Sequence, residues 1–166
     1  MRKIFLLFLC VVLVLCLCAC QQKNADIQEP VNFYYCRDEI SYNTIDAVIF
    51  PEVREAIEFG GDPTKMLDSY LLGPKANNCI SLIPTGTKLI SFQIIDGVGY
   101  VKFSDEFAKL SGVSLSTACS SIVLTLHEYT GFDVFRFSAN TKQLDNRDEI
   151  VVSVSDIILM DDGRKE

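Results

Sequence analysis

Residues 88–104 (KLISFQIIDGVGYVKFS) decide the fold, because Asp96-Gly97 between two apolar runs is the strongest short-range signal for a β-hairpin. A two-residue turn at that point makes Ile95 the partner of Val98 and sets every other pair. On one side the register pairs Ile94 with Gly99, Phe92 with Val101 and Ile90 with Phe103; on the other, Gln93 with Tyr100 and Ser91 with Lys102. One face is apolar and the other polar, which predicts a sheet covered by helices on one side only.

Two amphipathic helices are predicted to flank the hairpin. The first begins at Asp62-Pro63, an N-cap acceptor followed by proline, and ends at Gly73-Pro74. Its buried face has helical spacing and consists of Met66, Leu67, Tyr70 and Leu71. The second is capped by Ser114 and runs to about Tyr129, before Gly131, and its apolar stripe is Leu115, Ala118, Cys119, Ile122, Val123, Leu126 and Tyr129.

Further strands are expected at residues 31–36 (VNFYYC), 47–50 (AVIF, stopped by Pro51), 133–138 (DVFRFS) and 150–154 (IVVSV). Residues 53–59 could continue a strand or form a helical turn, and residues 75–84 read as a loop. The order predicts an α+β fold in which two helices pack on one face of a mostly antiparallel sheet. One domain at residues 31–160 and a polar tail at 161–166 account for the body of the chain.

The amino terminus has the features of an export signal. Arg2 and Lys3 precede an uninterrupted apolar run at residues 4–17, which is shorter than the roughly 20 residues of a membrane-spanning helix. The following Leu17-Cys18-Ala19-Cys20 resembles a bacterial lipobox, so we expect residues 1–19 to be a signal peptide and Cys20 to carry lipid. An ordinary signal peptide cut nearby, or an uncleaved anchor, is the alternative.

Residues 21–30 (QQKNADIQEP) are polar and without periodicity, and together with the lipidated Cys20 they are expected to form a flexible tether. The expected location is the outer face of the cell membrane, where the acyl chains hold the protein. Removal of Arg2 and Lys3 changes the net charge from −7 to −9. So acidic a chain lacks the basic surface that phosphate binding needs, which argues against nucleic acid as a partner.

The sequence contains no convincing catalytic constellation. Ser120 and His127 would lie about 10 Å apart on one helix, too far for a hydrogen bond, and no G-x-S-x-G turn accompanies them. The adjacent carboxylates Asp105-Glu106 and Asp38-Glu39 are interpreted as solvated surface charge. With one histidine and no P-loop, G-x-G-x-x-G or mature Cys-x-x-Cys, we expect no metal, no cofactor and no enzyme activity.

Four of the seven cysteines lie in the first twenty residues, which leaves Cys36, Cys79 and Cys119 in the body. Cys119 falls on a predicted buried stripe, where a free thiol behaves as a small apolar side chain. Whether Cys36 and Cys79 form a disulfide is left open by the sequence.

Five segments occur in a characteristic order: Phe33-Tyr34-Tyr35, Leu71-Leu72-Gly73-Pro74, residues 83–89 (IPTGTKL), residues 96–104 (DGVGYVKFS) and residues 121–126 (SIVLTL) leading to Val134. Together they resemble the GerMN domain family of sporulation and spore germination. The resemblance implies an extracytoplasmic module, often on lipoproteins of spore-forming Gram-positive bacteria, with a fold similar to ring-building modules and no recognised catalytic residues. The germination protein for which the family is named has tandem copies, whereas this chain holds one. This chain also has Ser138-Ala139-Asn140 where the family pattern leads us to expect a glycine turn.

The leading functional hypothesis is a lipid-anchored interaction module that binds envelope or sporulation proteins or a second copy of itself. Its candidate surface is the polar hairpin face of Ser91, Gln93, Tyr100 and Lys102, with the polar side of the second helix. The alternative is a peptidoglycan-binding module in which Tyr34, Tyr42 or Tyr100 stacks on sugar rings. An enzyme acting on envelope material is the third hypothesis.

Overall fold

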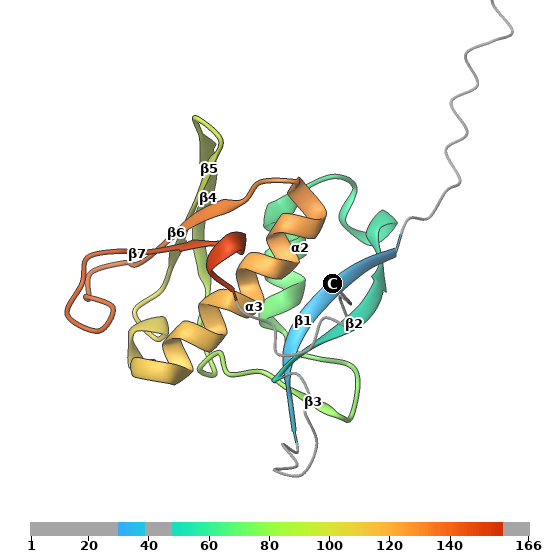
Figure 1. Ribbon diagram of the computed structural model, residues 1–166, viewed down its shortest axis with the longest axis horizontal. Helices are drawn as coiled ribbons and strands as arrows, with labels where there is room; N and C mark the ends of the chain where they lie inside the picture. The colour runs from blue at the N-terminus through green and yellow to red at the C-terminus, as the bar shows by residue number, and fades with distance from the viewer. Residues whose placement is uncertain (1–29, 39–47, 158–166) are drawn as a thin grey trace, which may run out of the picture.

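Two α-helices lie between two β-sheets in the computed structural model, which describes residues 30–38 and 48–157 (Figure 1). A three-stranded sheet has the order β2-β1-β3 and a four-stranded sheet the order β4-β5-β6-β7. The α+β class, the two helices and the mostly antiparallel pairing are confirmed, although the strands divide between two sheets where one was expected. In chain order the elements are β1 (Pro30–Arg37), β2 (Ile49–Glu55), η1 (Ala56–Phe59), α2 (Pro63–Leu71), β3 (Cys79–Ile80), β4 (Leu89–Ile95), β5 (Val98–Phe103), η2 (Phe107–Lys109), α3 (Gly112–Thr130), β6 (Val134–Ala139), β7 (Ile150–Ser153) and η3 (Val154–Asp156).

Helix α3 is buried on more than the expected stripe. Ser121, Leu124 and Thr125 are buried as well, because β1 packs against the side of the helix that faces away from the four-stranded sheet. A helix with apolar or small residues around most of its circumference is typical of an element enclosed on several sides. Thr125 contacts β1 directly, since its Oγ1 accepts the Tyr34 N–H. The sequence did not anticipate this second buried side because it did not separate the two sheets.

The β4–β5 hairpin has the predicted register over most of its length. Ile95 pairs with Val98 across a turn in which Asp96 and Gly97 have φ values of 52° and 79°, as a type I′ turn requires. The prediction that Ile90 pairs with Phe103 is wrong: a register irregularity between Leu89 and Ser91 makes Leu89 the partner of Phe103 and leaves Ile90 exposed. An irregularity of this kind inserts a residue that no alternation rule anticipates.

The first helix begins as predicted, and the second begins earlier. Asp62 Oδ1 accepts a hydrogen bond from the Thr64 N–H at 2.9 Å, which caps α2. Helix α3 follows Ser111 as its N-cap residue, so Ser114 lies inside the helix and is not its cap. At the other end the Gly131 N–H, at φ 76°, donates to the His127 carbonyl at 2.7 Å.

Pro51 does not stop the second strand, which continues to Glu55. Proline is tolerated because β2 is an edge strand and Pro51 lies opposite Tyr34, whose own N–H points away from β2 to Thr125 Oγ1. After Glu55 the chain turns into η1, so residues 53–59 are part strand and part helical turn. The order β5-β6 is parallel, because α3 connects these strands as a crossover.

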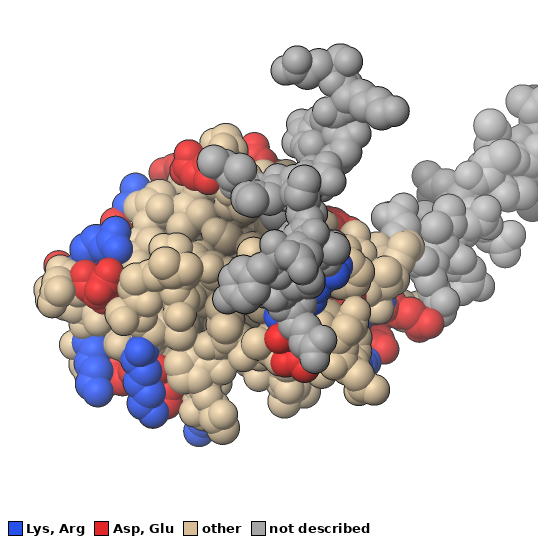
Figure 2. Space-filling view, turned by 60° about the horizontal axis from the view of Figure 1, so that its bottom comes forward, with Lys and Arg blue, Asp and Glu red and all other residues tan. Residues whose placement is uncertain are grey.

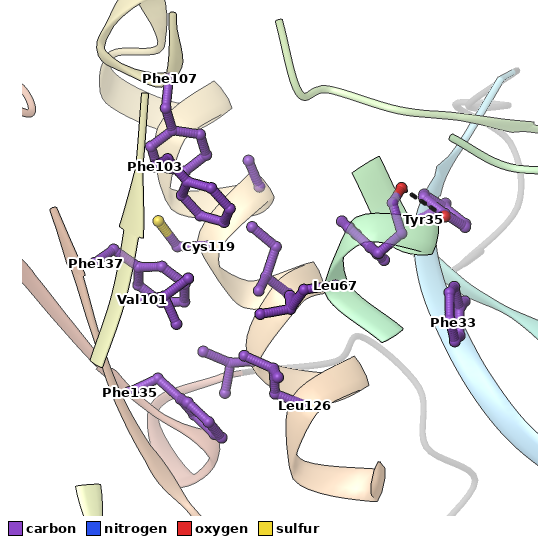
Figure 3. Packing of buried hydrophobic residues seen from close by; sticks show 14 of the residues in the cluster. Phe33, Tyr35, Leu67, Val101, Phe103, Phe107, Cys119, Leu126, Phe135 and Phe137 are labelled. Carbon is purple, nitrogen blue, oxygen red and sulfur yellow. Dashed lines mark hydrogen bonds between the residues drawn. The ribbon is translucent and has the colours of Figure 1, made fainter. Parts of the chain in front are cut away.

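The core is aromatic and reaches across both helices. Figure 3 shows Val101, Phe103, Phe135 and Phe137 on the side of the four-stranded sheet, and Phe33 and Tyr35 on the β1 side, with Leu67 and Leu126 between them. Each such side chain contributes about 1.5–3 kcal/mol when it is withdrawn from water. Among the described residues, no helix is both long and apolar enough to cross a membrane.

Candidate interaction surface

The four residues predicted as an interaction surface lie together on the outer face of the four-stranded sheet. Gln93 is directly opposite Tyr100 and Ser91 directly opposite Lys102. Alternation along β5 buries Val101 and Phe103 against the helices, so Tyr100 and Lys102 point to the other side. We call this surface, Ser91, Gln93, Tyr100 and Lys102, the outer face.

Residues of β6 and of the segment around β7, which the sequence analysis missed, border the outer face. Arg136 of β6 lies beside Tyr100, and its guanidinium carbon is 5.9 Å from the centre of the tyrosine ring, a cation–π contact. Arg136 also forms an ion pair with Glu149, and the exposed Val151 of β7 lies opposite it. Arg136 lies beside Tyr100 because β5 pairs with β6 in parallel, and local sequence patterns do not predict this pairing.

The free edge of β1, by contrast, is closed by side chains of α3. The Tyr34 N–H donates to Thr125 Oγ1 at 2.9 Å, and the Asn32 N–H donates to Glu128 Oε1 at 3.2 Å. The Tyr70 hydroxyl of α2 donates to the Tyr34 carbonyl at 3.0 Å. Because these backbone groups are satisfied within the chain, this edge offers little to a partner.

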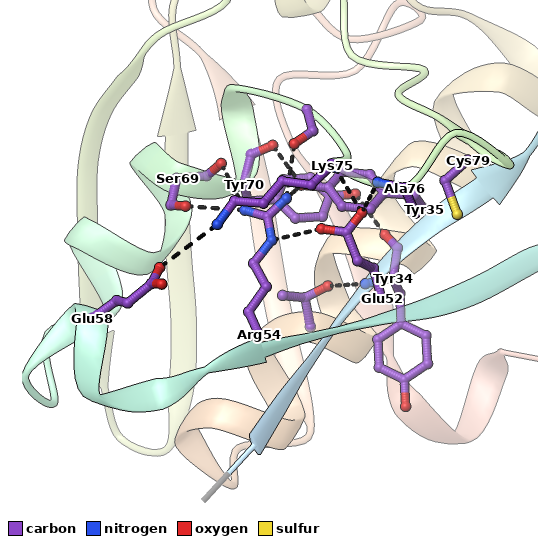
Figure 4. A network of polar contacts seen from close by, with 12 residues as sticks. Tyr34, Tyr35, Glu52, Arg54, Glu58, Ser69, Tyr70, Lys75, Ala76 and Cys79 are labelled. Carbon is purple, nitrogen blue, oxygen red and sulfur yellow. Dashed lines mark hydrogen bonds and ion pairs between the residues drawn. The ribbon is translucent and has the colours of Figure 1, made fainter. Parts of the chain in front are cut away.

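A buried ion pair on β2, Glu52 with Arg54, lies at the centre of a network of polar contacts (Figure 4). Arg54 Nε donates to Glu52 Oε1 at 2.7 Å, and Arg54 also donates to the carbonyls of Ser69 and Gly73 at the end of α2. Glu52 Oε2 accepts the N–H groups of Lys75 and Ala76 at 2.7 and 2.8 Å. The cluster ties the end of α2 and its following loop to β2.

The electrostatics of this cluster are those of a structural site. Burial tends to raise the pKa of Glu52, but the N–H of Ala76, the Arg54 guanidinium and the N–H of Lys75 outweigh it and hold the pKa below its usual value. Burial raises the pKa of Tyr35 and, strongly, that of Tyr70, so both phenols are neutral. An ionised pair with all its bonding groups engaged has no free group for catalysis.

Two of the remaining candidate groups, His127 and Asp105, also have structural partners. His127 Nδ1 lies 3.1 Å from both the Phe132 carbonyl and Asp133 Oδ1, at the end of α3. The Asp105 carboxylate accepts the N–H and the hydroxyl of Thr141, at 2.7 and 2.5 Å, and these bonds lower its pKa. Asp105 therefore fastens the turn that follows β6 to the start of η2.

Open cavities lie on the surface formed by the described residues, and two of them are candidate sites. One, of about 410 Å³, is lined by Ala56, Gly61, Pro63, Ile94, Tyr129, Thr130 and Phe132, without a carboxylate or histidine. The other, of about 450 Å³, is lined by Arg37, Asp38, Asn77 and Asn78. In the part of the chain that the structure describes, no group of three or more His, Cys, Asp or Glu residues could hold a metal ion.

The three body cysteines are free thiols and all are buried. The β1–β3 register pairs Cys36 with Ile80 and Arg37 with Cys79, which directs the Cys36 and Cys79 side chains to opposite faces of the sheet. The structure thus answers the question that the sequence left open, because thiols on opposite faces are not placed for a disulfide. Burial raises the pKa of Cys119 to about 12.

Cys20, Glu39 and Tyr42 lie outside the described residues, as do the predicted signal peptide, residues 21–29 of the predicted tether and the polar tail. Pro30, which was predicted to end the tether, is instead the first residue of β1. The two described tyrosines of the stacking hypothesis belong to different sheets: the Tyr34 hydroxyl donates to Glu128 Oε2 of α3, and Tyr100 is on the outer face.

On the face shown in Figure 2, acidic and basic side chains are interspersed, without a broad basic patch.

Comparison with known proteins identifies the domain. A family model described as Germane, sporulation and spore germination, matches residues 32–145. No match was found among curated proteins. The structure resembles the first GerMN domain of the sporulation protein GerM from Bacillus subtilis (TM-score 0.55, 17% identity, 72% of this chain and 91% of that one). It also resembles the tandem GerMN domains of the same protein (TM-score 0.55, 22% identity, 75% of this chain and 45% of that one). The fold and the family match agree, and this chain belongs to the Germane family of sporulation and spore germination.

Proposed function

We propose that this protein is a lipid-anchored interaction module on the outer face of the cell membrane, acting in sporulation or spore germination by contact and without catalysis. The observation that carries the proposal is the outer face itself. The helices cover the opposite side of the four-stranded sheet, and among the described residues no layer lies above Tyr100, Lys102 and Arg136. Family membership supports the sporulation-associated role.

The chemistry of the outer face suits a protein partner. An aromatic ring beside a guanidinium, with a carboxylate and an exposed valine at the rim, combines apolar area with directional polar groups. Tyrosine and arginine are enriched among residues that dominate protein–protein binding energies. The polar clusters elsewhere, around Arg54 and Asp105, are engaged in holding the fold.

Lipid anchoring is supported by Leu17-Cys18-Ala19-Cys20 and the apolar run before it. With Cys20 in the membrane, residues 21–29 would hold the domain within about 30 Å of the bilayer even when fully extended. A partner on the outer face would therefore itself be an envelope protein or have a domain close to the membrane.

Crosslinking in living cells tests this proposal. The chain is crosslinked during growth and during sporulation, and captured proteins are identified by mass spectrometry. We expect a defined envelope partner that is enriched in sporulating cells. A purified protein that hydrolysed an envelope substrate, with the rate lost on replacement of His127 or a carboxylate, would overturn the non-catalytic part.

Peptidoglycan binding is the second candidate, and the geometry favours it less because Tyr34 and Tyr100 do not form one stacking surface. Retention of the mature protein on purified peptidoglycan separates the two. Saturable binding that is lost on Tyr100→Ala would establish the glycan function in place of the protein partner.

A further inference from the structure

Strand β4 presents an open backbone edge. It is the terminal strand in the order β4-β5-β6-β7, and Ile95 and Val98 flank the two-residue turn as a hydrogen-bonded pair. Hydrogen-bonded pairs alternate in an antiparallel ladder, so Gln93 bonds to Tyr100 while the N–H and C=O groups of Phe92 and Ile94 point away from β5. Within the described ranges, no hydrogen bond of another element reaches these four groups.

The side chains of β4 do nothing to block this edge. The strand reads LISFQII, without a charged residue or a proline. Ile90, Ile94 and Ile95 are 51%, 40% and 48% exposed. Soluble proteins normally protect edge strands with lysine, proline, short length or a covering element, because an apolar edge pairs with other chains.

The other described edges are protected in these ways. β2 carries Pro51 and the exposed Glu55, and the free edge of β1 is closed by Thr125 and Glu128. β7 has four residues and β3 has two. Helix α2 packs against β4, but among the described residues no hydrogen bond from α2 reaches the outward groups of Phe92 and Ile94. In this respect the edge of β4 differs from the other described edges.

We propose that β4 pairs antiparallel with β4 of a second copy of this chain, about a two-fold axis at Gln93. Phe92 then lies opposite Ile94 of the second copy, and Ile94 opposite Phe92 of the second copy, which satisfies all four outward groups on each chain. The pairing is self-complementary, as a two-fold interface must be. Because β4 has no charged residue, its own side chains bring no like charges together across the axis, although each molecule is strongly acidic.

This inference deepens the proposed function. A two-fold axis perpendicular to the joined sheet places both outer faces on the same side, so the two Tyr100–Lys102 surfaces become one continuous surface. Anchoring two copies in one membrane would raise their local concentration, in the way that any tether raises an effective concentration.

Disulfide trapping in the full chain, expressed in cells and oxidised in the membrane, tests the pairing. Gln93→Cys places two thiols opposite each other at the axis, in the closely spaced type of cross-strand pair. We expect a crosslinked dimer on a non-reducing gel. Ser138→Cys is the matched control, because it lies on the same face but on β6, far from the axis, and should give at least tenfold less dimer.

Second substitutions in the Gln93→Cys background test whether β4 itself makes the contact. Ile94→Lys should reduce the trapped dimer at least tenfold through repulsion across the axis, whereas Ile94→Thr, which keeps a β-branched uncharged side chain, should retain it. Val53→Lys, at an exposed position of β2, should also retain it. Thermal unfolding of each variant verifies the fold.

Equal trapping at positions 93 and 138, no dimer at position 93, or insensitivity to Ile94→Lys would each overturn the inference. If a segment of the same chain or a different protein covered β4 instead, the Gln93→Cys protein would give no crosslinked homodimer. Crosslinking to a partner protein is measured separately for the Ile94→Lys variant. If no dimer forms but the partner is still captured, only this inference is contradicted. A dimer without any partner contradicts only the proposed function.

Discussion

The ring of Phe135 lies directly against the backbone of Gly99, its neighbour across the parallel β5–β6 pair. A Cβ atom on Gly99 would lie 2.4 Å from Phe135 Cδ1 and 2.6 Å from Cε1, well inside van der Waals contact. Gly99 is therefore required by close packing and is not part of the turn at Asp96-Gly97. Phe135 is fully buried, so the ring has little room to move away.

Gly99→Ala should destabilise the protein by about 1–3 kcal/mol, the usual range for overpacking in a core. Urea unfolding followed by circular dichroism measures the change. In a Phe135→Leu background Gly99→Ala should lower the free energy of unfolding by less, because leucine occupies less of the space above position 99. Strictly additive effects would show that the two residues are not in contact.

Glu52→Gln should reduce the free energy of unfolding by about 3 kcal/mol at neutral pH, because it leaves the buried Arg54 guanidinium without its counter-charge. The folded-state pKa of Glu52 lies below its unfolded value, so the stabilisation is present above the unfolded pKa of about 4.3 and is lost as the pH falls toward the folded pKa. The difference in the free energy of unfolding between the parent and the variant should therefore become smaller below about pH 4.

The control for Glu52 is Glu55→Gln, which changes an exposed carboxylate on the same strand and should alter stability by less than about 0.5 kcal/mol. If the loss of unfolding free energy in the Glu52→Gln variant stayed constant down to about pH 3, it would contradict the assignment of an ionised buried pair.

Phe92→Ala should lower the free energy of unfolding by about 2–3 kcal/mol, and Gln93→Ala should lower it by less than about 0.5 kcal/mol. The first removes a ring that packs against the core from the edge of the sheet, and the second trims a side chain on the outer face. The expected loss at Phe92 is smaller than for a fully enclosed ring because the side chain is only partly buried. Equal losses at the two positions, measured by thermal or urea unfolding, would mean that both faces of β4 are covered.

Tyr100→Glu combined with Lys102→Glu should abolish binding of any partner captured by crosslinking, while the unfolding midpoint stays close to that of the parent. Both side chains lie on the outer face, away from the helices. A matched control is Lys65→Glu combined with Leu72→Glu, which makes the same change in charge on or next to α2 at exposed positions. Retention of every partner by the first variant, with normal folding, would show that the outer face is solvated surface only.

Cys20→Ala should leave the precursor unprocessed or release the protein from the membrane fraction, because the thiol is the proposed site of lipid attachment. Cell fractionation and immunoblotting measure both outcomes, with Cys18→Ala as a neighbouring control that keeps Cys20. Normal processing and normal membrane association of the Cys20→Ala protein would contradict the anchor.

The hairpin was predictable because its cause is local. Asp96-Gly97 selects a turn whose geometry sets the pairing of the residues beside it, and the cross-strand pairs follow by alternation. The start of α2 at Asp62-Pro63 was predictable for the same reason, since a cap and a proline act on neighbouring backbone groups. The irregularity at Ile90 escaped prediction because it breaks the alternation on which the argument depends.

Long-range contacts account for the rest. By itself the sequence determined the α+β class, the helices, the hairpin and the four residues of the outer face, all of which depend on periodicity and turn chemistry. The tertiary structure alone decided that the strands form two sheets around α3, that Arg136 lies beside Tyr100, and that Glu52 and Arg54 are buried as a pair. Glu52 and Arg54 are charged residues that a sequence pattern would place in solvent. They are buried because α2 and the loop after it supply hydrogen-bonding partners from distant positions in the chain, and only the assembled fold brings those partners within reach.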